Sequence, residues 1–223
     1  MEFISTRSAK LRTNAAGAIL HGLASDGGLF LPDEIPHFSL EEITSMASMP
    51  YGEIASKVLE RFLPGFTGEE LGSFADAAYR SFDDPAVTPL HALGGGLYTL
   101  ELYHGPTCAF KDLALQMLPH LLTLSLEKSH PGATALILTA TSGDTGKAAL
   151  EGFRDVPGVR ILVFYPQNGV SEMQKLQMIT QEGDNVGVCA IEGNFDDAQT
   201  GVKKAFEEVN SSTEMTLIVD NQA

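Results

Sequence analysis

The chain has 223 residues, and its 14 Lys and Arg against 29 Asp and Glu give a formal net charge of −15 and a pI of about 4.6. So acidic a chain repels phosphate backbones, which argues against nucleic-acid binding. No stretch approaches the roughly 20 apolar residues of a membrane helix, and the N-terminal segment lacks the apolar core of a signal peptide. We therefore expect a cytoplasmic protein with no membrane partner. Its two cysteines are too few for a disulfide framework or a four-thiolate zinc site.

Residues 1–90 are predicted to form a small, mainly helical domain. Asp26-Gly27-Gly28 indicates a turn that leads into a short extended piece ending at Pro32. Helical spacing of apolar residues follows, and Ser39 and Thr67 stand at two expected helix starts as N-cap residues. The segments with this spacing are residues 39–49, 51–63 and 67–82.

Residues 91–223 alternate strand and helix, which predicts an α/β domain. Most of the candidate strands are continuous apolar runs, as expected for strands buried on both faces of a parallel sheet. They are Leu97–Leu102, Ala135–Ala140, Val159–Tyr165, Val186–Ile191 and Thr216–Val219, with helices starting near Lys111, Asp144, Ser171 and Asp196. The fold class is thus α/β, an open and mainly parallel sheet with flanking helices, preceded by the helical domain. Ligands of such sheets bind beyond the carboxyl ends of the strands.

The first candidate site is Lys111, in the segment Leu-Glu-Leu-Tyr-His-Gly-Pro-Thr-Cys-Ala-Phe-Lys-Asp of residues 100–112. Placed in the first turn of a helix, its amine faces the positive end of the helix dipole. Apolar neighbours such as Phe110 would add desolvation, and both effects favour the neutral amine that imine formation and proton abstraction require. The alternative is an ordinary surface lysine whose charge is compensated by Asp112.

The second candidate site is the Gly-rich turn Thr-Ser-Gly-Asp-Thr-Gly of residues 141–146. Its exposed N–H groups and the hydroxyls of Thr141, Ser142 and Thr145 would suit a carboxylate or phosphate. It is not a P-loop, because that motif needs Gly at position 141 and Ser or Thr in place of Ala148. Asp144 is either a helix N-cap or an acceptor for a ligand hydroxyl or ammonium, and both interpretations stay open.

Two further features have simpler explanations. Asn194, after Gly193, is expected to cap the start of a helix. His104 is the histidine nearest a candidate site, and we interpret it as a structural residue with satisfied hydrogen bonds. The histidines show no metal-ligand spacing, so no metal is expected.

Five ordered blocks resemble the threonine synthase family, fold-type II enzymes that depend on pyridoxal 5'-phosphate (PLP). The pairing of HGPT–AFKD with SGDTG is specific to this branch. The blocks are residues 22–32, 100–116, 139–150, 165–178 and 185–203.

The resemblance implies that Lys111 holds PLP as an internal aldimine and then acts as general acid and base. It implies conversion of O-phospho-L-homoserine and water to L-threonine and phosphate, the last step of threonine biosynthesis. Asp144 would approach the PLP 3-hydroxyl. The turn residues Ser142, Gly143, Thr145 and Gly146 would bind the substrate carboxylate.

The family's phosphate loop for PLP and its partner of the pyridine nitrogen lie beyond the region matched here. We therefore expect an N-terminal fragment whose sheet has exposed edges. The alternatives are a truncated, non-catalytic homologue that binds a small anion and a dehydratase-like PLP lyase. The sequence does not indicate the oligomeric state.

Overall fold

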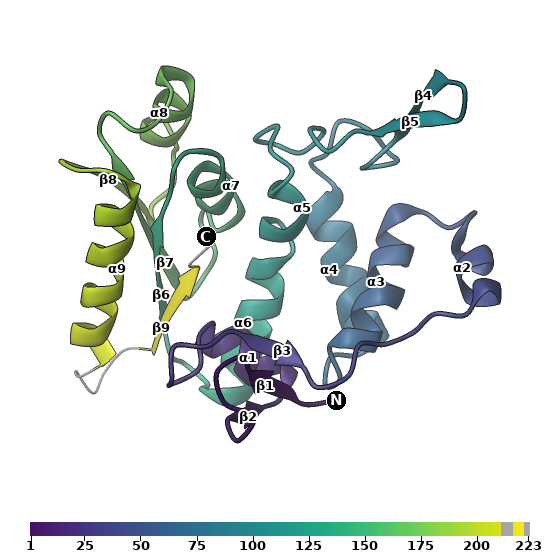
Figure 1. Ribbon diagram of the computed structural model, residues 1–223, viewed down its shortest axis with the longest axis horizontal. Helices are drawn as coiled ribbons and strands as arrows, with labels where there is room; N and C mark the ends of the chain where they lie inside the picture. Colours follow the sequence, from purple (N-terminus) through teal and green to yellow (C-terminus); the bar gives the residue numbers. More distant parts are fainter. Residues whose placement is uncertain (211–215, 221–223) are drawn as a thin grey trace.

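The computed structural model describes residues 1–210 and 216–220, and the side chains of residues 1–205 (Figure 1). Its centre is a parallel sheet with strand order β8-β7-β6-β9. The register sets Ala135 opposite both Val159 and Thr216. The strands are β6 (Ala135–Ala140), β7 (Val159–Pro166), β8 (Val186–Ile191) and β9 (Thr216–Asp220). The predicted α/β class with an open parallel sheet is confirmed.

Helices cover both faces of this sheet because its strands are apolar on both sides. Ile137 packs in the core shared with the helices of one face, and its neighbour Leu138 packs in the core beneath the opposite helix. The first face carries α5 (Asp112–Leu115), α6 (Leu118–Ser129), α7 (Asp144–Gly152) and α8 (Glu172–Ile179), and the second carries α9 (Phe195–Asn210).

The N-terminal part is mainly helical, as predicted. Ser39 and Thr67 both form capping boxes at the expected helix starts. The helices are α1 (Ala15–His21), α2 (Leu40–Met46), α3 (Tyr51–Phe62) and α4 (Gly68–Tyr79). An antiparallel sheet of order β2-β1-β3 joins them, formed by β1 (Phe3–Ser5), β2 (Arg12–Thr13) and β3 (Phe30–Pro32). Strands this short carry too little alternation to be seen in the sequence, apart from the extended piece that ends at Pro32.

Helix α6 packs against both parts of the chain. Leu122 and Leu126 belong to the core of the parallel sheet, whereas Met117, just before α6, and Leu121 belong to the core around α3 and α4. The division into residues 1–90 and 91–223 stays a prediction.

One strand prediction is wrong in its placement. Residues 97–100 form β5 (Leu97–Leu100), which pairs antiparallel with β4 (Leu90–Gly94) in a hairpin outside the parallel sheet (Figure 1). The linking glycines, Gly94 to Gly96, all have positive φ, a conformation that suits a tight hairpin turn. An apolar run resembles a buried strand, but the leucines of this hairpin are exposed.

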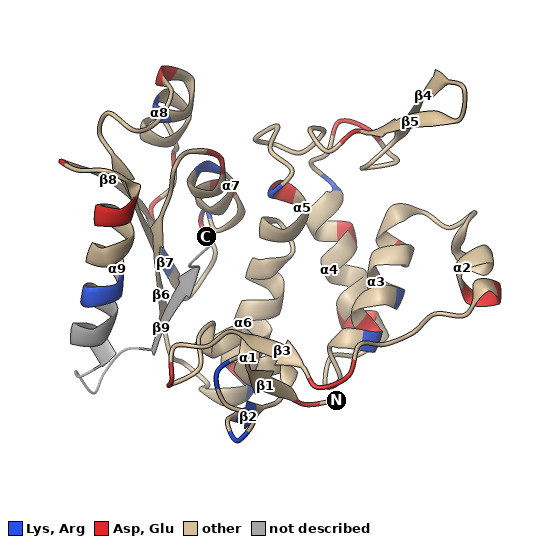
Figure 2. Cartoon of the chain, in the orientation of Figure 1, with Lys and Arg blue, Asp and Glu red and all other residues tan. Residues whose placement is uncertain are grey.

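The charges of the chain are spread over many elements. Figure 2 shows acidic residues on helices and loops of both parts of the chain. Among the described residues, no helix combines the length and the apolar character needed to cross a bilayer.

Candidate active site

Lys111 lies directly before α5, with helical backbone angles of φ −62° and ψ −22°. Its side chain is half-buried, and Nζ lies 5.0 Å from the centroid of the Phe110 ring. Phe110 is itself 57% exposed, and its desolvation of the amine stays a prediction. Within the described part of the chain, Nζ makes no hydrogen bond or salt bridge, so the amine is available to a ligand.

Asp112 does not compensate the charge of Lys111. Its side chain is fully buried, and its two oxygens accept hydrogen bonds from the Thr107 N–H, at 2.8 Å, and the Thr107 hydroxyl, at 2.7 Å. Burial raises the pKa of this carboxyl, and the bonds from Thr107 oppose the rise. The alternative in which Lys111 and Asp112 form a surface pair is therefore wrong.

Gly105 allows this arrangement because a Cβ there would lie 2.5 Å from both Cβ and Oδ2 of Asp112. The turn before Lys111 thus packs closely against Asp112, the first residue of α5. Sequence reasoning missed Thr107 and Asp112 as its anchors. The signal was a threonine five residues before an aspartate, and it is weak without knowledge of the turn.

The Gly-rich turn follows β6 and uses one hydroxyl internally. Thr141 is buried, and its Oγ1 accepts hydrogen bonds from the N–H groups of Gly143, at 3.0 Å, and Gly146, at 2.9 Å. This hydroxyl is not offered to a ligand, contrary to expectation. The N–H groups of Ser142, Asp144 and Thr145 have no partner among the described residues. They leave a donor set at the start of a nine-residue helix.

The two glycines of the turn permit close approach. Gly143 has φ +142°, and a Cβ there would lie 2.4 Å from the Gln174 side chain. A Cβ at Gly146 would lie 2.5 Å from Cγ2 of Thr141 and 2.8 Å from Cγ1 of Val163. Gly146 therefore lets α7 pack tightly against β7.

Asp144 is not the helix cap, because Gly143 occupies that position. Its exposed carboxylate accepts a 2.8 Å hydrogen bond from Nε2 of Gln174. The same amide accepts a 3.0 Å bond at Oε1 from the N–H of Ser171, the cap of α8. The Gln174 side chain thus completes the capping box of α8 and orients Asp144, and sequence reasoning missed this second role.

Packing of α5 on α7 brings the two candidate segments onto adjacent elements (Figure 1). Leu115 of α5 shares a core with Ala148 and Ala149 of α7, and a Cβ at Gly152 would lie 2.1 Å from the Leu115 carbonyl oxygen. Lys111 directly precedes α5, and residues 142–146 span the start of α7. The structure thus combines an unpaired amine with unpaired N–H donors and hydroxyls on neighbouring elements. Among the described residues, no group of three or more His, Cys, Asp or Glu could hold a metal ion.

Comparisons with known proteins agree on one family. A family model described as "Threonine synthase N terminus" matches residues 2–79. Threonine synthase of Pseudomonas aeruginosa is 46% identical over 209 residues, which is 93% of this chain and 44% of that protein. A PLP-bound threonine synthase from Brucella melitensis superposes with a TM-score of 0.90 at 38% identity, over 100% of this chain and 48% of that one. Along its own length, the chain matches the N-terminal part of threonine synthases.

The match is to the N-terminal part of the family. This chain spans about half the length of the two threonine synthases just named. It is also 38% identical to human threonine synthase-like 1 over 209 residues, which is 90% of this chain and 28% of that protein.

Proposed function

We propose that this chain is part of a PLP-dependent threonine synthase, a carbon–oxygen lyase that converts O-phospho-L-homoserine and water to L-threonine and phosphate. The last step of threonine biosynthesis would be its place, and the cytoplasm its location. The observation that carries the proposal is the likeness, along the whole chain, to a PLP-bound threonine synthase. The unpaired amine of Lys111 supports it independently.

The residues present fit PLP. The Nζ of Lys111 can bond covalently to an aldehyde carbon. Asp144, oriented by Gln174, offers a carboxylate to a ligand hydroxyl such as the 3-hydroxyl of PLP. When bound, PLP supplies an electron sink for the negative charge left by proton removal.

The chain's own groups then have separate tasks. Once the substrate amine has taken the place of Lys111, the freed Nζ would remove and return protons at the substrate carbons next to the cofactor. The N–H groups and hydroxyls of Ser142 and Thr145 would bind the substrate carboxylate. Gly143 and Gly146 shape this turn, since their own N–H groups are bonded to Thr141.

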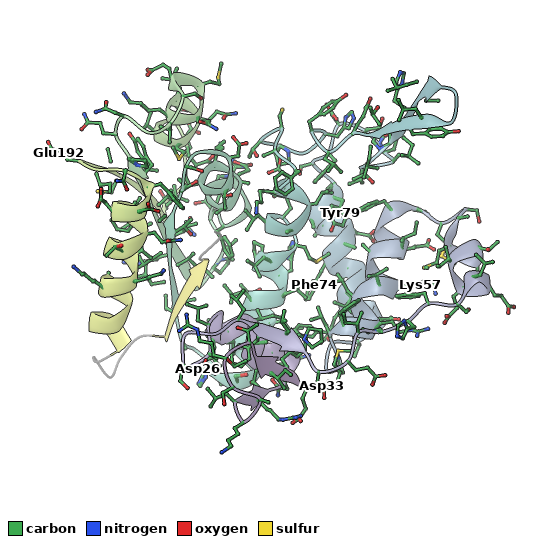
Figure 3. All side chains as sticks on the ribbon, viewed as in Figure 1. Asp26, Asp33, Lys57, Phe74, Tyr79 and Glu192 are labelled. Atoms are coloured by element: carbon green, nitrogen blue, oxygen red, sulfur yellow. The ribbon has the colours of Figure 1, made fainter. Side chains whose placement is uncertain are left out.

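The experiment is reductive trapping. The full chain is incubated with PLP and reduced with borohydride, and the modified lysine is located by mass spectrometry. We expect one dominant adduct, on Lys111, which Lys111→Ala abolishes. Lys57→Ala, on the exposed surface of α3, is the matched control and should leave the adduct unchanged (Figure 3). Equal labelling of surface lysines in a folded sample would refute cofactor attachment by this chain.

Activity separates the remaining alternatives. Phosphate release from O-phospho-L-homoserine supports the synthase, whereas 2-oxoacid formation from serine supports the dehydratase-like lyase. A folded chain that neither traps PLP nor turns over either substrate is the non-catalytic homologue that binds a small anion. The non-catalytic alternative stays open because this chain covers only 44% of the Pseudomonas aeruginosa enzyme and 28% of human threonine synthase-like 1.

A further inference from the structure

His104, seven residues before Lys111, lies between two carboxylates. Its Nδ1 is 2.6 Å from Oδ1 of Asp83, and its Nε2 is 2.8 Å from Oε2 of Glu101. A neutral imidazole has one N–H and would turn a lone pair toward one of these carboxylates. Both contacts become hydrogen bonds only when both ring nitrogens carry a proton. The geometry therefore calls for an imidazolium.

The surroundings of the ring agree with this charge state. Glu101 first, and then Asp83, raises the pKa of His104, and the more distant Asp84 acts in the same direction. The Tyr103 ring stacks on the imidazole, with centroids 4.7 Å apart. His104 first, and then Tyr103, holds the pKa of the Glu101 carboxyl low, and the charge of His91 acts in the same direction.

The contacts between His104 and Asp83 connect the segment that carries Lys111 to the corner of the chain, around Asp83, that follows α4. The Asp83 N–H also donates to the His104 carbonyl oxygen at 3.0 Å, so the corner and the segment meet twice. Four residues before Lys111, Thr107 is hydrogen-bonded to Asp112. The residue after Thr107 is Cys108, a non-glycine residue at φ +59°. Such a conformation persists only where the surroundings hold it.

We propose that His104 is a positioning residue which, as an imidazolium held by Asp83 and Glu101, fixes the turn that presents Lys111 to its cofactor. We call the two hydrogen bonds of His104, to Asp83 and to Glu101, the clamp. The inference rests on the proposed function for its purpose, but the clamp itself can be measured without the cofactor. The Glu101 contact should matter more, because the side chain of Glu101 is 23% exposed and that of Asp83 is 78% exposed.

The first readout is the protonation of His104 in the full chain without PLP. NMR of histidine-labelled protein, with the resonance assigned by its loss in His104→Gln, should give a titration midpoint above the ordinary value of about 6.5. Glu101→Gln should lower this midpoint more than Asp83→Asn does. A midpoint at or below 6.5 in the wild-type chain overturns the proposal.

The second readout is the order of the turn. The Cys108 N–H donates to the Gly105 carbonyl oxygen at 3.0 Å, so its hydrogen exchange reports the turn directly. In His104→Gln this amide should exchange about tenfold faster, which corresponds to a tenfold larger open population. His130→Gln, at an exposed histidine after α6, is the control and should exchange as the wild type does. Because the folded-state pKa of His104 is raised, the clamp is complete below about pH 6.5 and is lost as the pH rises through that raised value.

The third readout is the rate at which PLP and borohydride label Lys111, relative to Lys57 in the same sample. His104→Gln should lower this ratio about tenfold, because small displacements of a reacting group have large kinetic effects. An unchanged ratio in a folded variant overturns the proposal. If Lys111 is not preferred even in the wild type, the proposed function fails, while the titration and the exchange still decide whether the clamp exists.

Discussion

The hydrogen bond from the Thr107 hydroxyl to Asp112 offers the sharpest test of how the lysine segment is held. Thr107→Val keeps the shape of the side chain and the backbone N–H bond but removes the 2.7 Å donor to a fully buried carboxylate. Hydrogen bonds to charged groups contribute about 1.5–3 kcal/mol, so we expect a loss of about 2 kcal/mol in the free energy of unfolding. For a domain of this size, that corresponds to a fall of about 4–8 °C in Tm.

The pH dependence of this loss identifies the carboxylate as its cause. The Thr107 bonds hold the pKa of Asp112 down against burial, so removing one of them raises that pKa further. The stabilisation from Thr107 is present where Asp112 is ionised and is lost as the pH falls through its folded-state pKa. The cost of Thr107→Val should therefore be larger at pH 7.5 than at an acid pH below the folded-state pKa of Asp112.

Urea unfolding at the two pH values measures both effects. Thr107→Ser is the matched control, since it keeps the hydroxyl and loses one methyl group, worth about 0.8 kcal/mol. The reasoning is refuted if Thr107→Val lies within about 0.5 kcal/mol of the wild type at pH 7.5, or if Thr107→Ser costs as much.

Three further predictions concern the packing around the site. Gly146→Ala should cost about 2 kcal/mol or more in urea unfolding, because its Cβ overlaps Thr141, whereas Gly201→Ala on α9 has open space and should stabilise by up to about 1 kcal/mol. Tyr79→Phe should cost about 1 kcal/mol through the lost 3.1 Å bond to the Leu113 carbonyl oxygen; Tyr79 lies on α4 in Figure 3. Burial lowers the pKa of His120, so stability should fall as the pH drops below about 6.5, and His120→Gln should weaken that dependence in urea unfolding.

The parallel sheet could be predicted because its signal is local and repeated. Each of β6, β7 and β8 is a continuous apolar run followed by a helix start, so type and position follow from the pattern. The β4–β5 hairpin was misplaced because an apolar run does not say which side chains will be covered. Gly94-Gly95-Gly96 between two such runs was the available hairpin signal.

At the candidate site, the sequence predicted which residues carry reactive groups. It did not predict which of these groups form hydrogen bonds within the protein and are therefore not free to bind a ligand. Thr141 was expected to offer a hydroxyl to a ligand, and it binds its own turn instead. Asp144 was expected either to cap a helix or to face a ligand. Gly143 holds the cap position instead, and the Asp144 carboxylate accepts a hydrogen bond from Gln174, thirty residues away. Such hydrogen-bond partners depend on which segments the tertiary fold brings together, and the spacing of residues within a motif does not predict this.

The distinction between groups that are bonded within the protein and groups that are free to bind a ligand matters for what a motif match implies. In the HGPT–AFKD block, Gly105, Thr107 and Asp112 act on one another, and His104 is bonded to carboxylates on either side. Of the block's charged side chains, Lys111 is the one that has no hydrogen-bond or salt-bridge partner in the described part of the chain. Most of the block therefore serves to build the turn, and its presence argues for a correctly placed lysine rather than for a complete catalyst. The proposed trapping at Lys111 and the proposed turnover of O-phospho-L-homoserine must therefore be measured separately, because the first needs only the lysine and its turn, whereas the second also needs groups that bind and convert the substrate.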